Sequence, residues 1–189
     1  MAIENGNETK VGYRHKARVL GLLLVLLRLA ALLATVTATI VMALNKQTKS
    51  ITAAFVGTNP IIQTFTAKFQ QTPAFVYFVI ANAVASLYNL LVLLLRPFMK
   101  RKAHEIFEHL GGMVMVSVVA SGAAAAAAMA ELGKNGNLHA RWNPICNRFD
   151  AFCCRGGVAL IASFIGASLL MILNTVSTIT LYKNVASQD

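Results

Sequence analysis

The sequence is 189 residues long; 57% of its residues are hydrophobic, only 13% are charged, and its formal net charge is +10. An ordinary soluble domain has about 45–50% apolar and about 25% charged residues, so this composition excludes that class. The basic residues are spread along the chain without a stacking platform or a groove-binding motif, so we expect no nucleic-acid partner.

Four apolar segments account for this composition: residues 19–44, 74–95, 110–130 and 158–182. Each exceeds the roughly 20 residues that a helix needs to cross a hydrocarbon core about 30 Å thick. None alternates apolar and polar residues as a membrane β-strand does. The sequence therefore predicts an all-α membrane protein, a four-transmembrane-helix bundle that forms one domain over residues 19–182.

Four spans place both termini on the same side of the membrane. Basic residues are dense before the first span and in the sequence RPFMKRK between the second and third, and such residues favour the cytoplasmic side. The acceptor sequence Asn7-Glu8-Thr9 would then stay unglycosylated in the cytosol. We therefore expect cytosolic tails (1–18 and 183–189), one cytosolic loop (96–109) and two outer loops (45–73 and 131–157).

The first apolar segment contains one charged residue, Arg28, about nine residues or 13 Å inside it. An arginine near the middle of the bilayer costs about 2.5–3.5 kcal/mol to insert. Its helical face carries Ala31, Thr35 and Ala38, which are small enough for another helix to approach. We expect Arg28 to point into the bundle or a subunit contact; the alternative is that it extends to the cytosolic headgroups.

The candidate partners of Arg28 inside the membrane are amides. Asn82 and Asn89 lie on one stripe of the second segment, and Asn174 lies in the fourth. Their oxygens, together with backbone carbonyls, could accept hydrogen bonds from the five guanidinium donors. Glu108 and Glu131 flank the third segment near its opposite ends, so either would reach Arg28 only by snorkelling.

The sequence HEIFEH before the third segment superficially resembles a zinc-protease motif. That motif needs two histidines four residues apart on one helical face, whereas His104 and His109 are five apart and point in different directions. The chain also lacks a Gly-rich phosphate loop and a nucleophile beside a candidate base. The sequence therefore predicts no catalytic residue, no metal site and no cofactor.

Small residues at helical spacing occupy the third and fourth segments. Such residues let membrane helices approach closely, because lipid removes the usual hydrophobic drive for association. The predicted helix-packing positions are Gly122, Ala159, Ser163, Gly166 and Ala167.

The three cysteines all lie in the sequence NPICNRFDAFCCRGG, which the predicted topology places outside the cell. Disulfides persist there, so Cys146 could pair with Cys153 or with Cys154. The alternative is three free thiols.

Three stretches, in order, carry a resemblance to a known family: GTNPIIQTFTAKFQQTPAFVYFVIANAVASLYNLL, SGAAAAAAMAELGKNGN and HARWNPICNRFDAFC. By these the chain resembles the Casparian strip membrane domain protein-like family of plants, which is related more distantly to MARVEL-type four-helix membrane proteins. The resemblance covers nearly the whole chain. It implies four spanning helices, cytosolic termini, the plasma membrane and self-association into homo- or hetero-oligomers.

The resemblance also implies roles for single residues. It matches the family's pair of outer-loop cysteines to Cys146 and Cys153, and its first-helix arginine to Arg28. The family's third-helix aspartate falls on Gly112, counted back from MAELG, so the usual counter-ion position holds no carboxylate here. The first outer loop lacks the signature of the founding Casparian members, which leaves residence in the Casparian strip itself unsupported.

Two functional hypotheses follow. The founding members build a membrane platform that organises local cell-wall modification and limits diffusion, so the resemblance implies a non-enzymatic scaffold. Its partners would be copies of itself, related family members, membrane lipids and cell-wall-modifying enzymes. The second hypothesis is a small oligomeric channel or transporter, because an intramembrane charge near an asparagine stripe is a usual indication of transport.

Overall fold

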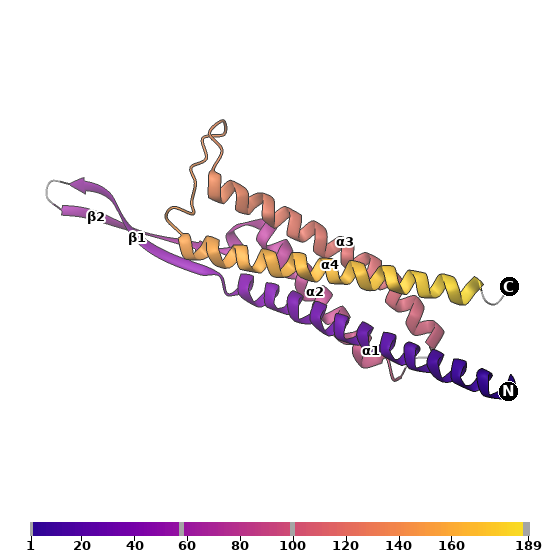
Figure 1. Cartoon of the computed structure of the whole chain (residues 1–189). Coiled ribbons are helices and arrows are strands. Elements are labelled where there is room, and N and C mark those ends of the chain that lie inside the picture. The colour runs from indigo at the N-terminus through magenta and orange to yellow at the C-terminus, as the bar shows by residue number, and fades with distance from the viewer. Residues whose placement is uncertain (1, 57–58, 99–100, 187–189) are drawn as a thin grey trace.

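Four long helices form an elongated bundle in the computed structural model, which describes residues 2–56, 59–98 and 101–186. They are α1 (Ala2–Ala43), α2 (Pro73–Leu95), α3 (Arg101–Asn135) and α4 (Asp150–Ala186). Figure 1 shows the start of α1, the end of α4 and the α2–α3 connection at one end of the bundle. The segments that join α1 to α2 and α3 to α4 lie at the other end.

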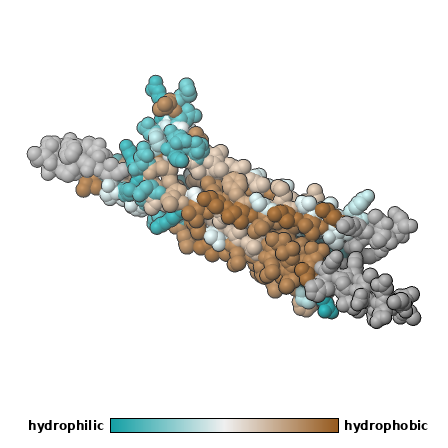
Figure 2. All heavy atoms as spheres, viewed as in Figure 1, coloured by the Kyte–Doolittle hydropathy of each residue, from teal (hydrophilic) through white to brown (hydrophobic). Residues whose placement is uncertain are grey.

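All four helices are long and apolar enough to cross a membrane, over residues 18–43, 73–95, 103–135 and 150–180. The predicted four-helix membrane fold is thus confirmed. Figure 2 shows the apolar residues spread along the helices, with hydrophilic residues gathered at the end that carries the α3–α4 loop. Such an apolar surface is suited to lipid rather than water.

The segment between α1 and α2, expected only as an outer loop, forms an antiparallel hairpin. Strand β1 (Lys46–Val56) pairs with β2 (Asn59–Lys68), with Lys46 opposite Lys68 and a register shift between Thr52 and Ala54. The strands are rich in threonine and isoleucine, whose branched Cβ atoms favour extended backbone. A short 3₁₀ turn, η1 (Phe69–Gln71), leads into α2. The hairpin projects well beyond the bundle (Figure 1).

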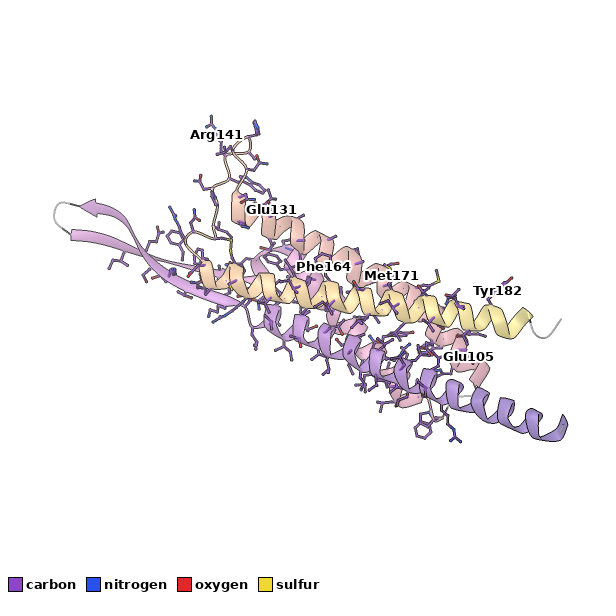
Figure 3. The ribbon with its side chains drawn as sticks, viewed as in Figure 1. Glu105, Glu131, Arg141, Phe164, Met171 and Tyr182 are labelled. Carbon is purple, nitrogen blue, oxygen red and sulfur yellow. A yellow bond between two sulfur atoms is a disulfide. The ribbon has the colours of Figure 1, made fainter. Side chains whose placement is uncertain are left out.

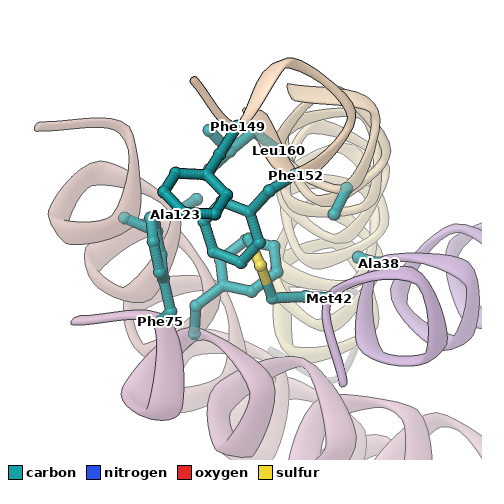
Figure 4. Packing of buried hydrophobic residues seen from close by; sticks show 10 residues of the cluster. Ala38, Met42, Phe75, Ala123, Phe149, Phe152 and Leu160 are labelled. Atoms are coloured by element: carbon teal, nitrogen blue, oxygen red, sulfur yellow. The ribbon is translucent and has the colours of Figure 1, made fainter. Parts of the chain in front are cut away.

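The aromatic core lies at the same end of the bundle as the hairpin. Figure 4 shows Phe75 of α2, Phe149, and Phe152 of α4 gathered with Met42 of α1. The rings of Phe75 and Phe152 meet edge to face, with centroids 6.2 Å apart, an arrangement that aromatic quadrupoles favour. Phe78 is also fully buried in this cluster. Ala123 and Ala126 of α3 belong to the same cluster, so this core joins all four helices at the hairpin end of the bundle.

Small residues allow the helices to approach elsewhere. A Cβ atom added to Gly122 would lie 3.0 Å from the Cβ atom of Ala81, and one added to Gly166 would lie 2.9 Å from Cγ2 of Thr35. All five residues expected at helix contacts are buried: Gly122, Ala159, Ser163, Gly166 and Ala167. The glycines therefore fix how closely α3 approaches α2 and how closely α4 approaches α1.

Candidate functional site

Arg28 lies inside the bundle and forms a salt bridge with Glu108 of α3. Its guanidinium Nη2 donates to the carboxylate Oε1 of Glu108, and the residue is only 6% exposed. The Glu108 side chain is 21% exposed. The side chain of Arg28 thus turns inward and has a carboxylate counter-ion within its own chain.

This pairing corrects the expectation that amides satisfy Arg28. The third helix begins at Arg101 rather than near residue 110, so Glu108 already lies about two turns inside it. Asn82 instead donates to the carbonyl of Phe78 and accepts from Ser163. The side-chain oxygens of Asn89 and Asn174 have no hydrogen-bond partner within the described part of the chain, and neither has Nη1 of Arg28.

His104 and Tyr88 lie beside this ion pair. We term Arg28, Glu108, His104 and Tyr88 together the charge cluster. Nδ1 of His104 lies 3.5 Å from Oε2 of Glu108, and its Nε2 lies 3.2 Å from the carbonyl oxygen of Val92. The hydroxyl of Tyr88 donates to the backbone carbonyl of Glu108 over 2.9 Å. The cluster therefore ties α1, α2 and α3 together near the end of the bundle that carries the α2–α3 connection.

Sequence reasoning missed Glu108, His104 and Tyr88 as members of one site. A signal was present, because His104 and Glu108 are four residues apart and so share a helical face. The cytosolic loop expected over residues 96–109 includes HEIFEH, so the sequence analysis did not place His104 and Glu108 on one helix. Figure 3 labels Glu105 and Glu131 toward opposite ends of α3, so Glu131, the other acid considered, lies far from this cluster.

Gly112, the position matched to the family's aspartate, lies one helical turn after Glu108 on the same face of α3. It packs against α4, since an added Cβ atom would lie 3.0 Å from Oδ1 of Asn174. The carboxylate that faces Arg28 is therefore supplied one turn earlier in this chain than the resemblance implies.

A buried polar stripe continues from the charge cluster along the bundle. The hydroxyl of Ser86 in α2 donates to Oγ1 of Thr35 in α1 over 2.9 Å. The hydroxyl of Ser163 in α4 donates to Oδ1 of Asn82 over 2.9 Å. These bonds fix the rotational register of α2 against two neighbours, which apolar packing in lipid specifies poorly.

The expected disulfide is present between Cys146 and Cys153, whose Cα atoms lie 5.7 Å apart, and Cys154 is free and exposed. The backbone N–H of Cys146 donates to the carbonyl of Gly133 over 3.2 Å. The disulfide therefore fastens the α3–α4 loop to the first turn of α4, beside the end of α3.

The base of the hairpin is fastened to the start of α4 as well. Asn45, which is 1% exposed, donates through Nδ2 to the carbonyl of Phe152 over 2.8 Å. The Phe152 N–H donates to Oε1 of Gln47 over 2.7 Å, and Lys49 forms an exposed salt bridge with Asp150 at 3.0 Å. These contacts hold the hairpin base against the disulfide loop.

The fold and the charge cluster define a class, the four-helix membrane proteins with an ion pair buried between their helices. Comparison with known sequences gives the family. The Casparian strip membrane protein domain matches residues 17–169, so the chain belongs to the Casparian strip membrane protein family.

Three relatives of the chain come from plants. It is 57% identical over 161 residues to CASP-like protein 1B1 of Sorghum bicolor, covering 85% of this chain and 76% of that one. It is 56% identical over 150 residues to CASP-like protein 1B2 of Oryza sativa subsp. indica, with 79% and 77% covered. It is 45% identical over 186 residues to CASP-like protein 1B2 of Populus trichocarpa, with 96% and 94% covered. No solved structure matches the chain significantly.

Proposed function

We propose that the protein is a non-enzymatic scaffold of the plasma membrane, with both termini in the cytosol. In this role it self-associates laterally, alone or with related family members, into platforms that organise local cell-wall modification or form a membrane barrier. Membrane lipids and cell-wall-modifying enzymes are its other proposed partners. Family membership supports this role.

The observation that carries self-association is an apolar stripe on the outer face of α1. Leu22, Leu26, Leu29 and Leu33 are 62%, 53%, 40% and 67% exposed. Their spacings of four, three and four residues match the repeat by which two helices interlock side chains along a shared seam. We therefore propose that the α1 leucine stripe, defined by these four residues, contacts the same stripe of a second copy.

Cysteine cross-linking tests this contact. Leu26→Cys and Leu33→Cys, each made with Cys154→Ala to remove the native free thiol, should give a covalent dimer when membranes are oxidised. Ile161→Cys in the same background is the matched control, because Ile161 is 64% exposed but lies on α4. Dimer yields at Leu26 and Leu33 no higher than at Ile161 would refute the α1 contact.

Liposome flux measurements separate the scaffold from the channel or transporter. Glu108 neutralises the charge of Arg28, and the helices of the protein pack closely. We therefore expect ion and solute flux through liposomes that contain the protein to be no greater than through empty liposomes. In plant plasma membrane, a tagged form should recover slowly after photobleaching. Flux well above the empty-vesicle control would overturn the scaffold proposal.

A further inference from the structure

The end of the bundle that carries the hairpin and the α3–α4 loop is strongly basic. Residues 45–73 and 131–157 hold seven lysines and arginines but only two carboxylates, an excess of five positive charges. Six of the seven cations are exposed: Lys46, Lys49, Lys134, Arg141, Arg148 and Arg155. Among the residues that the structure describes, Lys49 alone of these six forms a salt bridge, with Asp150. The charges of the other five are available to an anionic partner.

The placement of these cations favours an anionic polymer over a lipid surface. Figure 2 shows hydrophilic residues gathered where the α3–α4 loop leaves the bundle, past the apolar surface of the helices. A single exposed ion pair contributes little to binding, so affinity needs several pairs formed by one ligand. The cations lie on β1, at the end of α3, in the loop and near the start of α4. A linear polyanion can follow that path, whereas lipid headgroups stay at the level of the bilayer.

The α3–α4 loop holds its basic and aromatic side chains on a fixed turn. The backbone N–H groups of Asn137 and Trp142 each donate to the other's carbonyl over 2.9 Å. Oδ1 of Asn137 accepts from the backbone N–H groups of His139 and Ala140, both over 3.1 Å. Arg141 has a φ of 55°, in the left-handed region that few side chains adopt. Figure 3 labels Arg141 at the tip of this loop, beyond the end of α3. The turn is therefore formed before a partner binds, which lowers the entropic cost of association.

An exposed aromatic ring beside these cations favours a sugar chain among the polyanions. Trp142 follows Arg141 directly in the chain and is 55% exposed. The C–H bonds of a pyranose ring carry a slight positive charge, so the ring packs on the negative face of an aromatic side chain. A guanidinium group binds a carboxylate through two parallel hydrogen bonds. The two neighbours thus match the ring and the carboxylate of a uronic acid sugar.

We propose that this basic end binds an acidic polysaccharide, a linear chain of uronic acid sugars. Arg141 and Arg148 pair with its carboxylates, and Trp142 packs on a sugar ring. The inference rests on the proposed function in one respect, since the proposed orientation turns this end toward the cell wall, where such a polymer would lie. Binding to the purified protein does not depend on that orientation.

Titration of a fluorescent oligogalacturonate onto the full-length protein in phosphatidylcholine nanodiscs tests the site. The matched neutral probe is the methyl ester of the same oligosaccharide, which keeps the sugar rings but lacks the charges and should not bind. Raising the salt concentration from about 50 mM to about 200 mM should weaken oligogalacturonate binding about tenfold or more, because a bound polyanion releases counterions. Polyglutamate of equal charge should bind more weakly, since it has no sugar ring.

Two sets of variants locate the binding surface. Arg141→Asn with Arg148→Gln removes two charges, and asparagine tolerates the left-handed backbone at position 141. This double variant should weaken oligogalacturonate binding about fivefold or more. Arg18→Gln with Arg96→Gln removes two exposed charges at the opposite end of the bundle and is the matched control, which should bind like the wild type.

The second set tests the aromatic contact. Trp142→Ala should reduce the preference for oligogalacturonate over polyglutamate, and Trp142→Phe, which keeps an aromatic ring, should retain most of it. Because the preference compares two ligands on the same variant, a general loss of stability would not imitate this result.

Three outcomes would overturn the proposal. The first is that the methyl ester binds as well as oligogalacturonate. The second is that the loop double variant binds like its control. The third is that polyglutamate, or vesicles of phosphatidylserine, bind as tightly as oligogalacturonate, since the surface would then take any polyanion or a lipid headgroup. Cross-linking of the α1 leucine stripe is a separate measurement, so failure of the scaffold proposal and failure of this site remain distinguishable.

Discussion

At the level of single residues, the salt bridge between Arg28 and Glu108 joins α1 to α3 inside the bundle. Burying a guanidinium in hydrocarbon is unfavourable, and the carboxylate offsets that cost only while both groups are present. Glu108 also lies beside His104, and its backbone carbonyl accepts from Tyr88. A change at Glu108 therefore acts on three helices at once.

Replacing Glu108 with glutamine should lower the free energy of unfolding by about 3 kcal/mol, because it leaves Arg28 as an unpaired buried charge. This is the lower end of the range for buried pairs, since Glu108 is 21% exposed. Thermal unfolding in nanodiscs measures the loss. Glu131→Gln is the control and should change stability by less than about 1 kcal/mol, as expected for an exposed carboxylate. Equal losses in the two variants would contradict a structural role for the pair.

Replacing both partners by leucine separates stability from assembly. Arg28→Leu with Glu108→Leu removes both charges, so the double variant should be about as stable as the wild type or more so. If the charge cluster also organises assembly, surface delivery or oligomer size on a native gel will still change. An oligomer and a surface level like those of the wild type would restrict the cluster to folding.

At the level of secondary-structure elements, glycines set the distances between helices. Gly166→Ala would place a methyl group 2.9 Å from Thr35 Cγ2, forcing α4 and α1 apart, and should cost about 1–3 kcal/mol. Gly157→Ala is the matched control on the same helix, since its added Cβ atom meets open space. It should be neutral or stabilise by about 1 kcal/mol. Unfolding midpoints in nanodiscs compare the two, and equal midpoints would mean that Gly166 does not limit this approach.

The disulfide acts on the element that links α3 to α4. It joins cysteines seven residues apart, so replacing Cys146 with serine should cost about 2.5 kcal/mol by the loop-entropy relation. Nonreducing mass spectrometry should find Cys146 linked to Cys153, with Cys154 as the free thiol. Cys154→Ser is the control and should leave the unfolding midpoint unchanged. A Cys146–Cys154 link instead would contradict the structure.

At the level of the whole molecule, orientation in the membrane decides which end meets the cell wall. We expect the hairpin and the disulfide outside. Thr64→Asn on β2 creates a glycosylation acceptor, because Phe65 and Thr66 follow it, and this acceptor should be glycosylated in plant cells. The natural acceptor Asn7-Glu8-Thr9 is the internal control and should stay unmodified. If a glycosidase removes mass from Asn7 of the wild type, and the new asparagine at position 64 carries no glycan, the proposed topology is reversed.

The sequence by itself determined the four membrane helices, because crossing hydrocarbon is a requirement on the length and polarity of each segment taken alone. The sequence allowed Cys146 to pair with Cys153 or Cys154, and the family resemblance implied Cys153. Because Cys146 and Cys153 are only seven residues apart, they stay close in any fold. The hairpin was not foreseen, since threonine-rich strands outside the membrane carry a much weaker signal than an apolar span.

Only the tertiary structure decided which residue pairs with Arg28 and how Asn45 is buried. Arg28 and Glu108 are 80 residues apart, and their meeting depends on where α3 begins and how it is rotated against α1. Asn45, in the link between α1 and β1, is buried and donates to the carbonyl of Phe152 in α4. Hydrophobicity determines that a segment crosses the membrane. It does not determine how each helix is rotated or shifted against its neighbours, because steric packing and buried polar contacts between distant segments set that arrangement.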